Sequence, residues 1–224
     1  MKVTTDACLF GAWVADTIKN EKIIINNCLD IGCGSGLLSL MLAQQSNANI
    51  DAIEIDDETA AQATENEEAC SFRNKIKIVN ADVRNYRFEK KYDVIISNPP
   101  FYENELRSVS SKKNVAHHGD NLKLEELLYI IKDNLNKAGA FFLLLPFKRE
   151  DEIKALIEQA EMKLLKLILV RQSVNHHYFR IMLMGKLQTD KYLETEFDEI
   201  AIWDEHRQYT EEFVTLLKDY YLYL

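Results

Sequence analysis

The sequence contains few of the residues that interrupt a compact fold. It has only 7 glycines and 3 prolines in 224 residues, which argues against long flexible linkers, since these are rich in Gly, Ser and Pro. No apolar run reaches the roughly 18 residues that a membrane-spanning helix needs. No early stretch has the basic, apolar and small-residue regions of a secretory signal. We therefore expect a globular, cytoplasmic protein that does not enter a membrane.

Paired metal ligands are also missing from the sequence. None of the 4 cysteines stands at the paired spacing of a zinc site. The histidine pairs His117-His118 and His176-His177 have no recurring ligand partner. We expect reduced thiols, as in a cytoplasmic protein, and no metal ion.

Positive charge is scarce, because 27 Lys and Arg stand against 36 Asp and Glu, for a net charge of −9. This balance disfavours a nucleic-acid partner, since phosphate contacts dominate such binding, but local patches can override the total. One basic stretch lies between residues 107 and 123, and it is either a substrate-binding patch or a set of solvated loop charges. The candidate substrate-binding residues in it are Arg107, Lys112, Lys113 and His117.

Hydrophobic periodicity predicts alternating strands and helices up to residue 145. This order is typical of a doubly wound, Rossmann-like α/β fold with helices on both faces of a parallel sheet. A closing hairpin makes the last strand antiparallel, which gives seven strands in a mostly parallel sheet. The expected strands are residues 28–31, 50–55, 75–80, 92–97, 140–145, 163–170 and 178–185.

Two helices are predicted with defined ends. One follows a glycine-rich turn over residues 37–45, and another covers residues 123–136, where Gly139 is expected to stop it. One more β-like run, residues 199–203, precedes a C-terminal helix. We expect residues 1–224 to form a single domain, with an N-terminal helix or lid over residues 1–22 and a strand-helix appendage over residues 190–224.

The stretch Asn98-Pro99-Pro100-Phe101 follows the apolar strand 92–97. The two prolines end the strand because neither donates a ladder hydrogen bond, so Asn98 should project from the carboxyl edge of the sheet, where open α/β sheets bind ligands. The Asn98 side-chain oxygen and the Pro99 carbonyl could each accept one N–H of a planar amine. Phe101 could stack on the ring that carries the amine. The alternative is an ordinary strand-ending turn with a core phenylalanine.

A second candidate site is the turn that begins at Gly32, between a short strand and a helix. Glycines let a ligand approach the backbone without a Cβ clash, and the start of a helix favours a polar ligand tail. The spacing Gly-x-Gly-x-Gly differs from the dinucleotide pattern Gly-x-Gly-x-x-Gly, which would place its third glycine at Leu37. Glu54, at the end of the second strand, is a candidate ribose acceptor. Asp82, after the third strand, could accept an adenine amine or could cap its own turn.

In this order, the motifs resemble those of class I S-adenosylmethionine-dependent methyltransferases, over nearly the whole chain. The nearer resemblance is to the bacterial tRNA(Val) adenine N6-methyltransferase family. It rests on the opening residues 1–13 (MKVTTDACLFGAW), the loop 30–44 (DIGCGSGLLSLMLAQ), the Asn98–Phe101 corner and the segment 209–213 (YTEEF).

The resemblance implies transfer of a methyl group from S-adenosylmethionine to the N6 atom of an adenine in tRNA, beside the anticodon of tRNA(Val). It implies that the catalytic corner is Asn98, Pro99, Pro100 and Phe101. The implied cofactor-binding residues are Lys2, Thr5, Asp30, Gly32, Cys33, Gly34, Gly36, Glu54, Ile55, Asp82, Val83 and Asn98. The expected partner is the single-stranded anticodon loop of a tRNA, and the expected state is a monomer.

Two other functions remain open from the residues alone. One is a protein glutamine N5-methyltransferase of the release-factor type, which has a similar corner with Tyr in place of Phe101. The other is a non-catalytic RNA-binding protein on a methylase fold.

Overall fold

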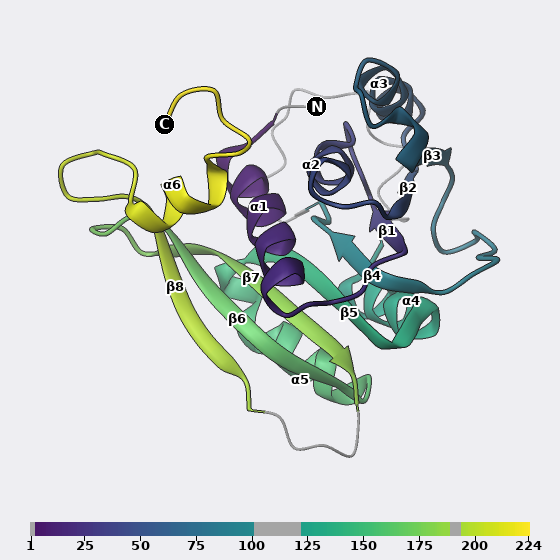
Figure 1. Cartoon of the computed structure of the whole chain (residues 1–224). Helices are drawn as coiled ribbons and strands as arrows, with labels where there is room; N and C mark the ends of the chain where they lie inside the picture. The colour runs from purple at the N-terminus through teal and green to yellow at the C-terminus, as the bar shows by residue number, and fades with distance from the viewer. Residues whose placement is uncertain (1–2, 101–121, 189–193) are drawn as a thin grey trace, which may run out of the picture.

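The structure is a computed structural model that describes residues 3–100, 122–188 and 194–224. Its described residues form one eight-stranded sheet in the order β3-β2-β1-β4-β5-β7-β6-β8 (Figure 1). The strands are β1 (Asn27–Ile31), β2 (Asn49–Glu54), β3 (Ile76–Asn80), β4 (Tyr92–Ser97), β5 (Leu135–Pro146), β6 (Met162–Ser173), β7 (Tyr178–Leu187) and β8 (Glu196–Trp203). Neighbouring strands from β3 to β5 pair in parallel, β7 runs antiparallel to β5 and β6, and β8 is parallel to β6.

The predicted doubly wound fold is confirmed, with one more strand than expected. The added strand is β8, which pairs with β6 at the edge of the sheet. Its first four residues, Glu196 to Glu199, are exposed, and Ile200 and Ile202 alone among its residues are buried. A strand with so little buried surface has a weak hydrophobic pattern, so the sequence suggested it only from residue 199.

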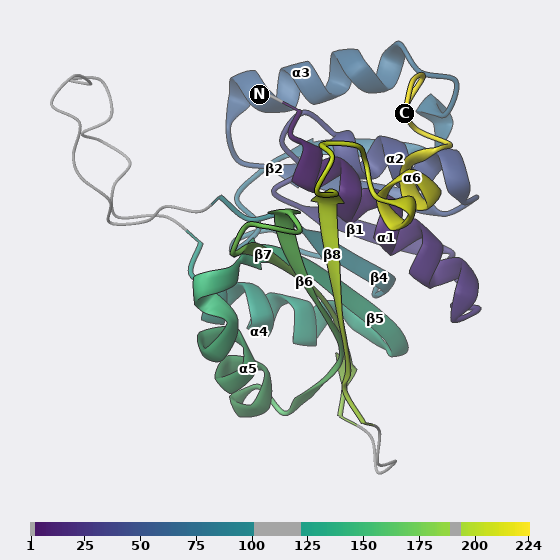
Figure 2. The same cartoon turned by 90° about the vertical axis from the view of Figure 1, so that its left-hand side faces the viewer.

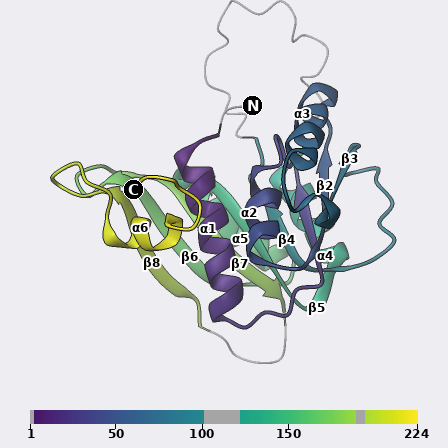
Figure 3. The same cartoon turned by 45° about the horizontal axis from the view of Figure 1, so that its top comes forward.

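Helices cover both faces of the sheet (Figure 2). One core cluster joins the sheet to α1, α2, α3 and α6, and the other joins it to α4 and α5. The helices are α1 (Thr5–Asn20), α2 (Leu37–Gln45), α3 (Asp57–Glu68), α4 (Leu124–Asn134), α5 (Glu150–Gln159) and α6 (Glu211–Leu217), with two short 3-10 helices, η1 (Arg73–Lys75) and η2 (Phe147–Arg149). The C-terminal end of the chain lies beside α6, on the side of the molecule where α1 lies (Figure 3).

The prediction that Gly139 stops a helix is wrong. Helix α4 ends at Asn134, and β5 begins at once because Leu135 pairs with Tyr92. Gly139 lies in the irregular start of β5, where an added Cβ would come within 2.8 Å of the Asp93 carbonyl oxygen. A close backbone approach, rather than a helix end, therefore requires glycine at this position.

Gly185 gives a test of core packing. It pairs with Phe141 across β5 and β7, and an added Cβ would overlap the Phe141 ring and lie 2.9 Å from the Lys163 carbonyl oxygen. We expect Gly185→Ala to lower the free energy of unfolding by about 1–3 kcal/mol, because overpacking forces the surrounding core to move. Urea unfolding measures this loss, and Phe141→Leu in the same chain should recover part of it. Additive losses in the double variant would contradict the overlap.

Within the described residues, no helix is both long and apolar enough to cross a membrane.

Candidate active site

The site lies where the order of strands reverses, between β1 and β4. The chain builds outward from β1 to β3 and then returns to place β4 on the other side of β1. In open α/β sheets, ligands bind at the carboxyl ends of the strands at this switch point. Ile31 pairs with Ser97, and the Ser97 hydroxyl donates a buried 2.7 Å hydrogen bond to the Ile31 carbonyl. The next residues, Gly32 and Asn98, therefore leave the two strands side by side.

The turn after β1 depends on glycine conformation. Gly32, Gly34 and Gly36 have φ angles of 70°, 57° and 82°. Residues that carry a Cβ rarely adopt such positive φ angles. The Gly32 and Cys33 amides donate to the Ile53 carbonyl at 2.8 and 3.1 Å, so the turn is held against β2. Gly36 then becomes the N-cap of α2.

Cys33 lies inside this turn and is 7% exposed. Burial raises the pKa of its thiol, and the nearby carboxylates of Asp30 and Glu54 add to the shift. The thiol therefore stays protonated at neutral pH, and Cys33 shapes the turn without acting as a nucleophile.

Glu54 ends β2 and is held by two backbone amides. Its Oε2 accepts from the Gly34 amide at 2.9 Å, and its Oε1 accepts from the Asp56 amide at 3.0 Å. Each carboxylate oxygen keeps a further acceptor site, so Glu54 can bind sugar hydroxyls without losing these bonds. The next residue, Ile55, is 57% exposed and offers an apolar surface beside the carboxylate.

Asp30 is a buried carboxylate of β1, two residues before the glycine turn begins. Its side chain is 0% exposed, and its Oδ2 accepts from the Ser39 hydroxyl at 2.7 Å. Its Oδ1 is buried without a hydrogen-bond partner among the described residues. Burial raises the pKa of Asp30 to about 7; the Ser39 hydrogen bonds oppose this shift and the Glu54 carboxylate adds to it. A buried oxygen without a partner and a second carboxylate nearby fit a ligand with a positively charged group.

Asn98, which directly follows β4 on the other side of the switch point, also has a buried side-chain oxygen without a partner. Its Oδ1 is buried and has no hydrogen-bond partner among the described residues. Pro99 is buried and Pro100 is exposed. A buried amide oxygen without a partner costs free energy unless a ligand or water satisfies it, so Asn98 is a candidate acceptor for a ligand N–H. Phe101, Arg107, Lys112, Lys113 and His117 lie outside the described residues.

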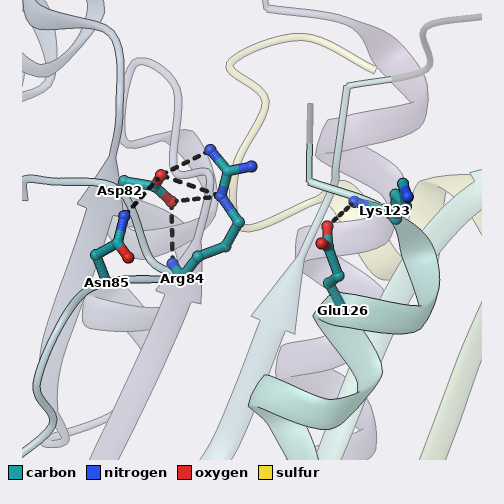
Figure 4. A network of polar contacts seen from close by, with 5 residues as sticks. All are labelled: Asp82, Arg84, Asn85, Lys123 and Glu126. Atoms are coloured by element: carbon teal, nitrogen blue, oxygen red, sulfur yellow. Dashed lines mark hydrogen bonds and ion pairs between the residues drawn. The ribbon is translucent and has the colours of Figure 1, made fainter. Parts of the chain in front are cut away.

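The turn after β3 holds Asp82 in a local network (Figure 4). Asp82 Oδ1 accepts from the Arg84 amide at 3.0 Å, and Asp82 Oδ2 accepts from Arg84 Nη2 at 2.6 Å and Asn85 Nδ2 at 3.3 Å. Hydrogen bonding to Arg84 lowers the pKa of Asp82, so the carboxylate is ionised at neutral pH. This is the turn-capping role that the sequence left open, and contact of Asp82 with an adenine amine stays a prediction. Val83, which follows it, is 8% exposed.

The predicted N-terminal residues lie at the start of α1. The N-cap is Thr4, and Thr5 and Asp6 form the first turn. Asp6 Oδ2 accepts from Arg180 Nε at 2.8 Å, and Arg180 faces Pro146 at the carboxyl end of β5. The first turn of α1 therefore lies at the same edge of the sheet as the candidate site. Lys2 is outside the described residues.

Sequence reasoning missed several polar residues that support the site. Ser39 and Ser97 are both 0% exposed, and each donates to a site strand. The sequence could have indicated these two residues, because each serine lies within an apolar helix or strand, and a buried hydroxyl needs a hydrogen-bond partner. Arg84, which holds Asp82, carries no such signal.

Within the part of the chain that the structure describes, no group of three or more His, Cys, Asp or Glu side chains could hold a metal ion.

Comparison with known families gives a match over most of the chain. A model of the methyltransferase small domain matches residues 12–144. A tRNA1(Val) (adenine(37)-N6)-methyltransferase of Dyadobacter fermentans is 41% identical over 184 residues, which cover 82% of this chain and 74% of that protein. A protein of the same name from Bacteroides thetaiotaomicron is 34% identical over 227 residues, which cover 100% of this chain and 92% of that protein.

Solved structures agree on the fold. A predicted O-methyltransferase from Agrobacterium tumefaciens has a TM-score of 0.71 at 17% identity and covers 95% of both chains. The glycopeptide N-methyltransferase MtfA, solved with sinefungin, has a TM-score of 0.60 at 9% identity, over 80% of this chain and 87% of that one. At these identities the likeness concerns the fold alone.

Proposed function

The chain belongs to the methyltransferase small-domain family and, within it, to the tRNA1(Val) (adenine(37)-N6)-methyltransferase family, and we propose that it methylates the N6 atom of adenine 37 in that tRNA. The methyl donor is S-adenosylmethionine. A tRNA substrate implies that the enzyme works in the cytoplasm.

The observation that carries this proposal is the position of Asn98. Its buried Oδ1 has no hydrogen-bond partner among the described residues, and it follows Ser97, which pairs with the last residue of β1. The amide is therefore next to the glycine turn that begins at Gly32. An acceptor oxygen beside a cofactor cradle is what positioning of an amine requires.

In the proposed mechanism, the enzyme orients the amine instead of deprotonating it with a strong base. Asn98 Oδ1 and the Pro99 carbonyl accept the two N–H bonds of the adenine amine, which turns the nitrogen lone pair out of conjugation with the ring. Alignment and exclusion of water then supply most of the rate enhancement. When bound, S-adenosylmethionine supplies a sulfonium methyl: a nitrogen–carbon bond forms, the sulfur keeps the electrons of the broken bond, and the nitrogen loses one proton to solvent. Phe101 stacks on the target base.

The residues of the site fit the donor in charge and shape. Asp30 and the Gly32–Gly36 backbone are proposed to hold the methionine portion, because the orphaned Asp30 Oδ1 suits a cationic group. Glu54, with both oxygens oriented by backbone amides, is proposed to accept the ribose hydroxyls. Asp82 and Val83 are proposed to contact the adenine. Thr5 and Lys2 are proposed to lie over the methionine end.

The substrate is proposed to be the single-stranded anticodon loop, since a base must be unstacked to reach a buried acceptor. Arg107, Lys112, Lys113 and His117 are proposed to contact its phosphates. We expect tRNA binding to weaken as salt rises, in proportion to the number of phosphates neutralised.

Mass spectrometry of nucleosides tests the function directly. Transfer RNA from a strain lacking this activity is incubated with the protein and S-adenosylmethionine. A new N6-methyladenosine peak at position 37 of tRNA1(Val) is expected. Labelled donor incubated with separate RNA and protein pools distinguishes the alternatives: label in protein would favour a glutamine methyltransferase. No label in either pool would indicate a non-catalytic RNA-binding protein.

A further inference from the structure

The ends of β1 and β4 are joined by a side chain as well as by their backbone pairing. Ser97, the last residue of β4, pairs in register with Ile31, the last residue of β1. The Ser97 hydroxyl donates a hydrogen bond of 2.7 Å to the Ile31 carbonyl. Both residues are buried, so solvent does not compete for this bond.

The glycine turn that follows β1 has a second anchor, which does not involve β4. The Gly32 and Cys33 amides both donate to the Ile53 carbonyl of β2, at 2.8 and 3.1 Å. The Gly34 amide donates to Glu54 Oε2, at the end of the same strand, at 2.9 Å. These three bonds connect the turn to β2, so the turn does not depend on β4 alone for its position.

The corner that follows β4 has fewer donors of its own. Asn98 comes directly after Ser97, and the next two residues, Pro99 and Pro100, have no backbone N–H to donate. Asn98 Oδ1 is buried and accepts no hydrogen bond from a described residue. The Ser97 hydroxyl, one residue away, binds the carbonyl that directly precedes Gly32. It therefore connects the corner to the turn that forms the proposed cofactor cradle.

Transfer of a methyl group between the two halves of the site depends on their spacing. The rate of such a step depends on the distance and angle between the reacting atoms, and a misplacement of about 1 Å can cost about a hundredfold. A bond that fixes the acceptor corner relative to the donor cradle therefore acts on the chemical step, although it touches neither ligand.

We infer that Ser97 is a positioning residue for methyl transfer: its hydroxyl holds the Asn98 corner in register with the cradle that begins at Gly32. The inference rests on the proposed function. Asn98 contacts the substrate, and Ser97 acts through Asn98 by setting its distance from the donor.

A buried serine can also serve stability alone, and the chain offers a matched control for that role. Ser46 Oγ donates to the Leu42 carbonyl at 2.9 Å, which is the same kind of bond as that of Ser97. Ser46 directly follows the last residue of α2, whereas the glycine turn directly precedes the first. The two serines therefore make comparable bonds, and the nine-residue helix separates Ser46 from the turn.

Single-turnover methylation of tRNA by the full chain, with saturating donor, tests the inference. Ser97→Ala removes the hydroxyl with little change in volume, and the rate should fall by about tenfold. The Kd for S-adenosylmethionine, measured by calorimetry, should stay within about threefold of wild type, because the bonds to β2 still hold the turn. Ser46→Ala should leave both the rate and the Kd unchanged. Urea unfolding of both variants shows that each is folded under the assay conditions.

A double variant shows whether Ser97 acts through Asn98. In Asn98→Ala the amide that Ser97 holds in place is gone. Adding Ser97→Ala to Asn98→Ala should therefore lower the rate by less than about threefold further, well below the effect of Ser97→Ala in the wild type.

Four results would overturn the inference. The first two are a Ser97→Ala protein with a lower urea midpoint but a wild-type rate, and a loss of rate that Ser46→Ala reproduces. The others are a donor Kd that rises as much as the rate falls, and the full effect of Ser97→Ala in the Asn98→Ala background. A wild-type chain that transferred no methyl group to tRNA would instead overturn the proposed function, so the two failures are distinguishable.

Discussion

Replacement of Asn98 by alanine should lower kcat for tRNA methylation by about a hundredfold or more, the typical effect of removing one hydrogen bond that is placed for the transition state. In the wild type, Asn98 Oδ1 is already buried beside the glycine turn and has no hydrogen-bond partner among the described residues. The Asn98 side chain therefore gives up no hydrogen bond to a described residue when it accepts the adenine amine. Its loss leaves the adenine amine free to rotate, with its lone pair conjugated to the ring. Single-turnover kinetics with saturating donor measure this effect without a contribution from product release.

A matched control for Asn98→Ala is Asn26→Ala. Asn26 is exposed and immediately precedes β1, at the opposite edge of the sheet from Asn98. The control should keep the wild-type rate. The Kd for S-adenosylmethionine should change less than about tenfold in Asn98→Ala, because the cradle from Gly32 to Gly36 is intact. A wild-type single-turnover rate in cofactor-saturated Asn98→Ala would show that another group orients the amine.

The fold could be predicted from the sequence wherever one local signal dominated. Strand β4 and helix α2 cover the residues expected for them, because β-branched runs and a glycine turn fix their ends. The prediction for Gly139 was wrong because a glycine after an amphipathic helix commonly ends that helix. In the structure the helix ends earlier, and Leu135 pairs with Tyr92 instead. That pairing joins segments 43 residues apart, a relation that periodicity does not contain.

The candidate site also has one part that the sequence predicts and one part that it does not. Asn98, Asp30 and the glycines follow strand ends, so their common edge could be inferred from the alternation of strands and helices. The packing of α6 on α1 could not be inferred in this way, because it brings together segments from the two ends of the chain. Sequence motifs locate the groups at the site, and tertiary packing determines which residues hold them in place.

Replacement of Asp30 by asparagine should change the response of the protein to pH. Burial raises the pKa of Asp30 from 3.8 to about 7, so between these values the folded protein holds a proton that the unfolded chain has lost. The stability of the ligand-free wild type should therefore fall as pH rises from about 4 to 7, and it should level off above 7. Asparagine mimics the protonated form, so Asp30→Asn should lack this decline and be more stable than wild type at pH 8. Urea unfolding at intervals between pH 4 and 8 measures the difference.

Donor binding should show the opposite pH dependence. A cationic group beside Asp30 favours the carboxylate, so the affinity of wild type for S-adenosylmethionine should rise as pH increases through 7, with release of a proton. In Asp30→Asn, binding should be weaker at pH 8 and should release no proton from this site, as calorimetry in two buffers of different ionisation enthalpy can measure. Asp51→Asn is the control. The Asp51 carboxylate accepts a hydrogen bond from the Tyr92 hydroxyl at 2.7 Å and pairs with Lys90 Nζ at 3.0 Å, so this substitution should leave the proton release on donor binding unchanged. Equal proton release by wild type and Asp30→Asn would mean that the cationic part of the donor binds away from Asp30, and the buried carboxylate would then have only a structural role.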